Sequence, residues 1–427
     1  MKIRSAAATA TATDSPAPPH KAADHSLSAA APRKRKRDRN PKKSKKGERI
    51  KPKKLGLRKW VWSSKDCSRF EDKFVVVSYN ILGVENALKH PDLYGGVPPR
   101  FLEWERRRRL IRKEIKRYSP SILCFQEVDR FFDLAEVLKE DGFEGVYKAR
   151  TGDACDGCAI FWKEEKFILL HQENIEFNQF DLRNNVAQFC ILKMNVNHSS
   201  TDGNPHSSLS LPTRSIIVGN THMLFNPNRG DIKLGQIRLF VERAYKLSKE
   251  WGDIPVVISG DFNSTPKSAI YQYLASSELN LLLHDRRRIS GQVDCSSSCR
   301  TFTASTVNVN RSLTFRWNEE ELYLAAGSTV DTHLYHKLRL SSAYAGVPGN
   351  FKTRDGDGEP LATSYHSKFM GTVDYIWHSK ELVPVRVVET LPIDNLRKTG
   401  GLPSKKWGSD HLSLVCELAF SDDGTMT

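Results

Sequence analysis

Short runs of Val, Ile and other apolar residues recur from residue 74 onward, and polar side chains follow at their ends. Apolar runs of about four to eight residues between turn-forming residues are typical of buried β-strands. The polar residues at these ends are Asn80, Glu127, His222, Asp261 with Asn263, Asp374, and Asp410 with His411. Because a rigid sheet can present several strand ends at one edge, we expect these carboxylates, amides and imidazoles to lie together in one site.

The order of the apolar patterns predicts a mixed α/β fold. Strands are expected over residues 74–82, 122–125, 159–163, 187–195, 215–220, 255–259, 373–378 and 412–417, and helices over residues 101–118, 132–140, 233–251 and 268–276. Strands outnumber helices and come partly in adjacent pairs, which favours two packed sheets with helices on the outer faces over one doubly wound sheet. Within residues 101–118, the consecutive arginines Arg106 to Arg109 are interpreted as a solvated helix face.

Charge divides the chain into two parts. Residues 1–59 contain 19 Lys and Arg against 4 Asp and Glu, a net of +15 that equals the formal charge of the whole chain. In the remaining residues, positive and negative side chains are equal in number, which removes the argument that a basic folded domain binds nucleic acid. No Phe, Tyr or Trp precedes Trp60, so residues 1–64 are predicted to be a disordered basic tail. Residues 65–420 are expected to form one catalytic domain, with surface insertions at residues 197–213 and 295–310 and a disordered C-terminus at residues 421–427.

The basic runs RKRKR, KKSKK and KPKK in the tail indicate a nuclear import signal, with a solvated linker as the alternative. We therefore expect the protein to be located in the nucleus, in the cytoplasm or in both. The Ala-, Ser- and Thr-rich start leaves an organelle transit peptide open, although Asp14 and Asp24 count against it. No apolar run is long enough to span a membrane, so we expect no membrane partner, and we expect a monomer.

Eight cysteines without a secretory signal predict reduced thiols. Cys155 with Cys158 forms a C-x-x-C pair, and Cys295 with Cys299 forms a C-x-x-x-C pair, so a zinc site is an alternative. Cys158 lies in an apolar run and the second pair in a Ser-rich stretch, which favours thiols without a metal.

Seven motifs in order, SYNIL, QEV, DGCAIFW, NTHM, GDFNSTP, VDYIW and SDHLSL, together resemble the endonuclease/exonuclease/phosphatase superfamily. Within it they resemble the carbon catabolite repressor 4 class of poly(A) deadenylases, over nearly all of residues 70–420. A single motif of this kind is weak, whereas seven in the right order are specific. The resemblance implies a DNase-I-like two-sheet sandwich and a 3'-to-5' exoribonuclease that shortens the poly(A) tails of mRNA.

Hydrolysis of a phosphodiester requires a nucleophilic water and stabilisation of charge on the phosphoryl oxygens, which a hard divalent cation supplies. Mg²⁺ prefers oxygen ligands and keeps several waters, so one or two carboxylates suffice, and Glu127 is the best candidate. The resemblance implies that Glu127 is the principal metal ligand, with Asn80 beside it; Asp410 is also expected at the metal. One or two Mg²⁺ ions are expected, with Mn²⁺ as a substitute.

Asp261 and Asn263 are two residues apart, and Gly260 permits a turn that aims both at one phosphate. The resemblance implies that Asp261 binds metal or activates the attacking water and that Asn263 contacts the scissile phosphate. A helix cap before the next helix is the alternative for this segment.

Two imidazoles complete the expected catalytic set. A His can donate to a phosphate oxygen when charged or accept a proton when neutral, and a neighbouring carboxylate fixes its tautomer. The resemblance implies that His411 lies against the phosphate and against Asp374 or Asp410, and that His222 stabilises the transition state.

Substrate choice is expected to depend on side chains that stack on bases of single-stranded RNA. The resemblance implies that Phe369 stacks on adenine and that Pro227 contacts a base; a core position is the alternative for Phe369. The stretch around Phe369 departs from the deadenylase pattern at Ser364, His366, Ser367, Lys368 and Met370, which puts the preference for poly(A) in doubt. Residues 1–64 contain no leucine-rich repeat, so docking through such repeats is not expected, as in plant homologues that lack them.

Two other functions stay open. Nucleotide 2'-phosphatases and 2',5'-phosphodiesterases share this fold, and an inactive RNA-binding protein could use the basic tail. The presence of the whole set of polar strand ends argues against an inactive protein.

Overall fold

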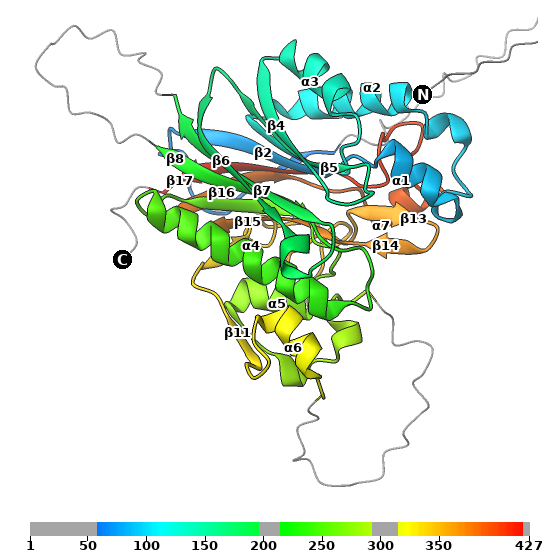
Figure 1. Cartoon of the computed structure of the whole chain (residues 1–427). Coiled ribbons are helices and arrows are strands. Elements are labelled where there is room, and N and C mark those ends of the chain that lie inside the picture. The colour runs from blue at the N-terminus through cyan, green and yellow to red at the C-terminus, as the bar shows by residue number, and fades with distance from the viewer. Residues whose placement is uncertain (1–57, 196–213, 293–314, 422–427) are drawn as a thin grey trace, which may run out of the picture. The chain divides into compact units, whose positions relative to one another are not determined.

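A computed structural model describes residues 58–195, 214–292 and 315–421 of the chain, all within one compact unit (Figure 1). The predicted insertions at residues 197–213 and 295–310, the Cys295 and Cys299 pair, residues 422–427 and the basic runs of the tail lie outside the described residues. Among the described residues, no helix combines the length and the apolar character that a bilayer span requires.

Two mixed sheets form the centre of the fold (Figure 1). In spatial order, the first contains β1 (Trp60–Trp62), β16 (Leu382–Val388), β17 (Leu414–Phe420), β2 (Lys73–Asn80), β3 (Ile122–Gln126), β5 (Gly157–Lys163) and β4 (Phe143–Ala149). The second contains β12 (Leu340–Ser342), β15 (Asp374–Ser379), β9 (Val256–Asp261), β8 (Ser215–His222), β7 (Val186–Met194) and β6 (Phe167–Glu176). Two small sheets pair β10 (Glu278–Asn280) with β11 (His333–Tyr335) and β13 (Ser364–His366) with β14 (Phe369–Gly371).

Helices cover the outer faces of the two large sheets. The α-helices are α1 (Val84–Lys89), α2 (Trp104–Ile115), α3 (Phe131–Lys139), α4 (Gly230–Glu250), α5 (Ala269–Ser276), α6 (Glu319–Ala326) and α7 (Ile393–Arg397). Short 3₁₀ helices lie at Pro91–Leu93, Pro99–Phe101, Lys116–Tyr118, Phe177–Phe180, Leu281–Leu283 and Arg286–Arg288. Figure 1 shows α2 and α3 beside the first sheet and α4, α5 and α6 beside the second. The predicted α/β sandwich is therefore confirmed.

Strand β2 shows why the apolar runs fold in this way. Because successive side chains point to opposite faces of a strand, Val76 packs into the core between the sheets, with Ile122 and Val218. Val75 and Val77 point the other way, into the core beneath α2 and α3. Both faces of the strand are buried, which is the reason its sequence is a continuous apolar run.

Strand register brings the polar ends together. Strands β8 and β9 are parallel and pair His222 with Asp261, while β15 runs antiparallel to β9 and pairs Asp374 with the same Asp261. In the first sheet, β2 and β3 are parallel and end at Asn80 and Gln126, directly before Glu127. The register thus sets three predicted site residues in one row across the second sheet.

Two predictions about charged residues are wrong. Arg107, expected on a solvated face, is fully buried, and its Nη1 atom donates to the carbonyl oxygens of Ile81 and Leu82, each at 2.8 Å. Arg58 was placed in the tail, yet its side chain is buried and pairs with Glu114 at 2.9 Å. The folded domain therefore includes residues 58–64, because β1 extends the first sheet and Arg58 anchors it to α2.

The cysteines of the described residues are free thiols. Cys158 is buried in β5, where burial raises the pKa of its thiol, while Cys155 is exposed. Within the described part of the chain, no cluster of metal-ligating side chains includes a cysteine. Nothing in these residues supports the zinc alternative.

Candidate active site

The polar strand ends surround one cavity of about 440 Å³. Its lining includes the predicted residues Glu127, His222, Asp261, Asn263, Asp410, His411, Phe369 and Pro227. Asn80 and Asp374 are hydrogen-bonded to this lining. The structure therefore brings together every residue that the sequence pattern selected.

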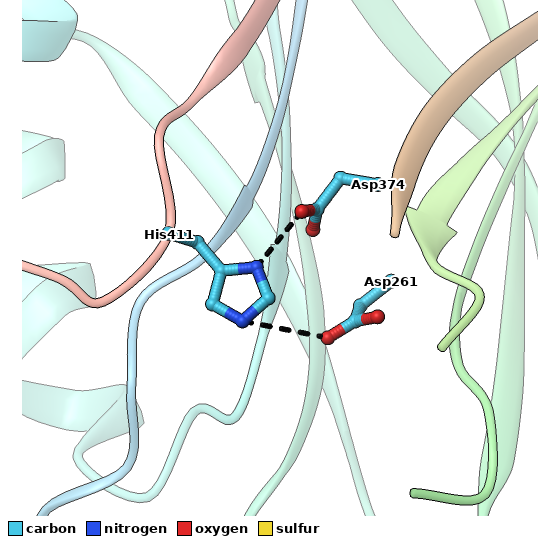
Figure 2. Close-up of side chains that lie close together, drawn as sticks. All are labelled: Asp261, Asp374 and His411. Atoms are coloured by element: carbon cyan, nitrogen blue, oxygen red, sulfur yellow. Dashed lines mark hydrogen bonds and ion pairs between the residues drawn. The ribbon is translucent and has the colours of Figure 1, made fainter. Parts of the chain in front are cut away.

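A carboxylate between two imidazoles forms the floor of the cavity. Oδ2 of Asp261 lies 3.6 Å from Nε2 of His222 and 3.7 Å from Nε2 of His411. Figure 2 shows His411 between Asp261 and Asp374, whose Oδ2 atom lies 2.8 Å from Nδ1 of the imidazole. The Asp374 contact fixes the ring so that Nε2 faces Asp261. Of the two partners left open by the sequence, Asp374 is the one that orients His411.

The two imidazoles differ in their tendency to carry charge. Burial lowers the pKa of His222, although Asp261 and Glu127 oppose this effect. Burial also disfavours the charged form of His411, but Asp374 and Asp410 raise its pKa well above the usual value. At neutral pH, His411 is therefore a charged hydrogen-bond donor and His222 is a neutral group.

Asn263 fixes the tautomer of His222. Its Nδ2 atom lies 3.1 Å from Nε2 of His222 and donates to the carbonyl oxygen of Met223 at 3.0 Å. Because the amide nitrogen is a donor, Nε2 of the neutral ring accepts and the ring proton lies on Nδ1. The backbone of Asn263 has a φ of 46°, and Nζ of the buried Lys233 lies 2.5 Å from its carbonyl oxygen. Lys233 thereby holds Asn263 in a left-handed conformation that few residue types adopt.

The helix-cap alternative for Asp261 and Asn263 is wrong. Helix α5 begins at Ala269, and its cap is Ser268, whose side chain accepts from the backbone N–H of Tyr271. Asp261 instead accepts from the backbone N–H of Asn263 at 2.9 Å. The segment after β9 is thus a turn that presents both side chains to the cavity.

Asn80 joins the two halves of the site. Its Nδ2 atom donates to Oε1 of Glu127 at 2.9 Å and to Oδ2 of Asp261 at 3.0 Å. The other amide atom, Oδ1, accepts from the backbone N–H of Leu82 at 3.0 Å. Asn80 therefore presents a donor, and not its oxygen, to the two carboxylates. In this arrangement it positions the carboxylates and does not offer the predicted metal ligand.

Glu127 is held by a complete set of donors. Its Oε2 atom accepts from the backbone N–H of Gly83 at 3.0 Å and from Nδ2 of Asn86 at 2.9 Å. Burial opposes its ionisation, but His222 and hydrogen bonds from Asn86 and Asn80 hold the pKa of Glu127 well below its usual value. The carboxylate is thus ionised and rigidly placed. Asn86 was not selected from the sequence, because it lies in α1 and follows no strand.

The donor set fits a divalent cation. Carboxylate oxygens of Asp261 and Asp374 and a ring nitrogen of His411 lie within 4.8 Å of one another. Oδ1 of Asp374 is buried without a hydrogen-bond partner among the described residues, so one carboxylate oxygen is unused. Because the charged His411 keeps both ring protons, the carboxylate oxygens of Asp261 and Asp374 are the atoms of this cluster that a hard divalent ion can bind.

This cluster differs from the predicted set of ligands. It consists of residues predicted to be catalytic, and of the predicted ligands Glu127 is joined to it through Asn80. Asp410 lines the same cavity and accepts from the hydroxyl of Tyr94 at 2.9 Å.

Rings gather at the mouth of the cavity. Phe369 is half-buried, lines the cavity and lies 6.0 Å from the ring of His366, so the core alternative for Phe369 is wrong. His90 and the exposed Phe225, which also line the cavity, form a second pair with ring centroids 6.5 Å apart. Sequence reasoning missed this pair, although Phe225 follows the end of β8 two residues before Pro227. An exposed aromatic residue beside a polar strand end was the available signal.

A buried row of carboxylates and imidazoles on a two-sheet sandwich defines a hydrolase of phosphate esters. The model of the endonuclease/exonuclease/phosphatase family matches residues 77–411, and the chain belongs to this family. It is 58% identical to "Carbon catabolite repressor protein 4 homolog 5" of Arabidopsis thaliana, over 86% of this chain and 81% of that protein. "Carbon catabolite repressor protein 4 homolog 3" of the same plant is 48% identical to the chain, over 86% of this chain and 80% of that protein. The predicted relation to carbon catabolite repressor 4 proteins is confirmed.

Solved structures share the fold. The crystal structure of ANGEL2, described as a 2',3'-cyclic phosphatase in complex with adenosine-2',3'-vanadate, is 30% identical with a TM-score of 0.67. The match covers 86% of this chain and 99% of that chain. The catalytic domain of human Nocturnin matches with a TM-score of 0.53 at 24% identity, which supports the fold alone.

Proposed function

We propose that the chain is a Mg²⁺-dependent 3'-to-5' exoribonuclease that shortens poly(A) tails of mRNA. The observation that carries the proposal is the Asp261 carboxylate between His222 and His411, at the floor of a cavity whose mouth carries two ring pairs. The floor suits hydrolysis of a phosphate ester, and the rings suit single-stranded bases. The plant relatives are named carbon catabolite repressor protein 4 homologs, which is the class of deadenylases that the seven motifs resemble.

The protein's own side chains divide the work on the phosphate. Glu127, Asp261 and Asp374 would hold the cation, which when bound supplies charge stabilisation and a water of lowered pKa. Charged His411, oriented by Asp374, donates a hydrogen bond to a phosphoryl oxygen where negative charge develops. Asp261 faces the space between the imidazoles and orients the attacking water. The burial of these groups keeps bulk water from screening their charges.

The mouth of the cavity favours a strand end with unpaired bases. Base stacking on an aromatic ring is worth about 1–3 kcal/mol per base and requires no particular base. Phe369 with His366 and Phe225 with His90 provide two such platforms around one cavity. Arg150 also lines the cavity, where it can pair with a phosphate of the strand. Single-stranded RNA is therefore the proposed substrate, with poly(A) as its preferred form.

A second candidate is hydrolysis of a 2',3'-cyclic phosphate at an RNA 3' end. It is favoured by the likeness to ANGEL2, which covers 99% of that chain and is described as a 2',3'-cyclic phosphatase. The same site could open such a ring, because the reaction also needs a water, a cation and donors to the phosphoryl oxygens. Both candidates act at the 3' end of RNA and differ in the bond that breaks.

One set of substrates separates the candidates. The full chain is incubated with Mg²⁺ and with four substrates in separate reactions. These are a 5'-labelled A 20-mer, a 5'-labelled U 20-mer, a 5'-labelled A 20-mer that ends in a 2',3'-cyclic phosphate, and a 2'-phosphorylated dinucleotide. Stepwise shortening of the A 20-mer supports the exonuclease, and ring opening without shortening supports the second candidate. Release of phosphate from the dinucleotide alone would indicate a 2'-phosphatase.

Two controls show that the site carries the activity. Glu127→Ala should remove turnover and keep the melting temperature within a few degrees, and a chelator should remove it reversibly, with recovery on adding Mg²⁺ or Mn²⁺. An unchanged rate in Glu127→Ala would contradict the metal assignment. Binding of RNA without turnover of any substrate would indicate the inactive RNA-binding protein.

A further inference from the structure

A second cavity, of about 310 Å³, lies outside the active site between the Pro99–Phe101 turn and the loop of residues 398–407. Its lining includes Phe101, Trp407, Lys398, Lys405, Lys406 and Ser404, and we call it the basic pocket. We propose that the basic pocket binds the RNA strand upstream of the 3' end that occupies the active site. This inference rests on the proposed function, since it supplies a second contact for the same strand.

An aromatic ring between two guanidinium groups forms one wall of the basic pocket. The ring of Phe101 lies 5.1 Å from the guanidinium of Arg100 and 4.9 Å from that of Arg106. Nη2 of Arg106 also donates to the carbonyl oxygen of Lys405 at 3.2 Å, which ties the arginine to the opposite loop. The guanidinium planes that cover this ring can in turn accept a base in a stack, while the neighbouring lysines reach the adjoining phosphates.

Four of the cations around the basic pocket lack counter-charges among the described residues. Arg100, Arg106, Lys398 and Lys405 form no ion pair with any described residue. Elsewhere on the same helix α2, Arg112 is paired with Asp141 at 2.9 Å. Clustered cations without acidic partners produce a positive potential that attracts a polyanion. The part of the chain from residue 60 onward has no net charge, so this cluster is a local feature.

The basic pocket and the active site share one segment of chain. Trp407 precedes Asp410 by three residues, so their Cα atoms are at most about 11 Å apart. The loop is also fastened to β13, because the backbone N–H of Leu402 donates to the carbonyl oxygen of Tyr365 at 3.0 Å. The N–H of Tyr365 in turn donates to the carbonyl oxygen of Asp410 at 3.0 Å. One strand only a few nucleotides long can therefore reach both cavities.

The chemistry of the basic pocket favours RNA over an acidic peptide. An acidic peptide would use the lysines but has no group that requires Phe101 between two guanidinium planes. A nucleotide uses both features, with its phosphate on the lysines and its base stacked on a guanidinium plane. The short path to the site proposed to cut RNA points to the same ligand.

The test compares a pocket variant with a matched control. Lys398→Ala/Lys405→Ala removes two exposed cations from the basic pocket, and Lys337→Ala/Lys380→Ala removes two exposed cations elsewhere. Lys380 follows the end of β15 opposite to Asp374, about 20 Å from the active site. Both variants carry the same net charge and leave the basic tail unchanged.

Length dependence is the readout. With full chains, an A 20-mer and an A trimer are compared by KM and kcat, and binding of the labelled 20-mer is measured by anisotropy with chelator present. The pocket variant should raise KM and Kd for the 20-mer about tenfold and leave kcat and the values for the trimer unchanged. Its slope of log K against log salt should fall by about 1.4, from two lost phosphate contacts. The control variant should behave as the wild type.

The outcomes separate the two proposals. Wild-type affinity of the pocket variant for the 20-mer, or an equal loss in the control variant, would overturn the basic pocket as an RNA site. If a Glu/Asp-rich peptide binds in the basic pocket and RNA does not compete with it, the pocket is a site for an acidic peptide and the RNA proposal is overturned. If the wild type shortens no RNA, the exonuclease proposal fails, while the anisotropy comparison still decides whether the pocket binds RNA.

Discussion

Asp374 and His411 contact each other through a buried carboxylate oxygen and Nδ1 of the imidazole, 2.8 Å apart. The two residues are 37 positions apart in the chain: Asp374 opens β15 of the second sheet, and His411 lies in the segment that leads into β17 of the first sheet. The same imidazole faces Asp261 through Nε2. The contact therefore joins the two sheets at the reaction site and fixes the direction in which His411 donates.

Asp374→Asn should lower kcat by about 10²- to 10⁴-fold, the usual range for loss of an oriented proton donor. The amide keeps the size of the side chain but not the negative charge, which favours the charged imidazole and would help to hold the cation. KM should change much less, because the ring platforms stay in place. Steady-state kinetics on the A 20-mer measure both values. Asp253→Asn, at an exposed position, is the control and should retain wild-type kinetics.

Phe225→Ala should weaken binding of a substrate with bases at its 3' end. Loss of one stacking contact costs about 1–3 kcal/mol, which corresponds to roughly a 5- to 150-fold rise in KM. The ring of Phe225 is exposed, so the free energy of unfolding should change little. KM is measured for an A 20-mer and for the same strand with abasic residues at its 3' end. Equal effects of the substitution on both strands would show that Phe225 does not stack on a base.

The strand ends were predictable because a buried strand imposes a recognisable apolar run. The sequence pattern could suggest that these residues lie together, but their relative positions depend on the strand register. Pairing of β9 with both β8 and β15 sets His222 and Asp374 on either side of Asp261. Asn86 was missed because it follows no strand, and Phe225 was missed although it comes shortly after the NTHM motif. Their roles depend on where α1 and the loop after β8 pack in three dimensions.

Several elements carried no clear pattern. Strand β6 is largely exposed, and its polar residues hide the alternation that marks a strand. Strand β16 contains Pro384, which argues against a strand in the sequence, and the structure accommodates it at an irregularity of register between Pro384 and Arg386. The buried position of Arg107 was equally hidden, because the carbonyl groups that satisfy it come from other segments.

Arg58→Ala should lower the free energy of unfolding by about 3–5 kcal/mol, since removing one partner of a buried ion pair leaves the other charge unpaired. The side chains of Arg58 and Glu114 are 0% and 4% exposed, and Arg58 also donates to Ser413 Oγ at 2.9 Å. Urea denaturation gives the change in free energy. Lys249→Ala removes a solvent-exposed ion pair with Asp253 and should cost at most about 1 kcal/mol.

Truncation provides an independent check on the boundary of the domain. A chain that lacks residues 1–54 keeps Arg58 and should unfold at the wild-type urea concentration. A chain that lacks residues 1–59 should lose stability as Arg58→Ala does, contrary to the boundary drawn from charge and composition. Equal stability of the two truncated chains would show that the Arg58–Glu114 pair does not anchor the first sheet.

Glu359 is a buried carboxyl group away from the active site. It accepts from the hydroxyl of Tyr271 at 2.9 Å. Burial raises its pKa to about 7, although hydrogen bonds from Ser342 and Tyr271 and the charge on Arg354 oppose the rise, while Asp355 adds to it. Because the folded state holds the proton more tightly than the unfolded chain, the stabilising effect of protonation is present below about pH 4.5 and is lost as the pH rises through 7.

Glu359→Gln should therefore remove a pH dependence of stability. The amide stays neutral and can keep the contact with Tyr271, so the variant should be more stable than the wild type at pH 8, by on the order of 3 kcal/mol. The difference should shrink toward pH 5, where the wild-type carboxyl is protonated in the folded state. Urea denaturation of both chains between pH 5 and 8 measures the difference, in which other titrating groups cancel. A constant difference across this range would show that Glu359 does not take up a proton on folding.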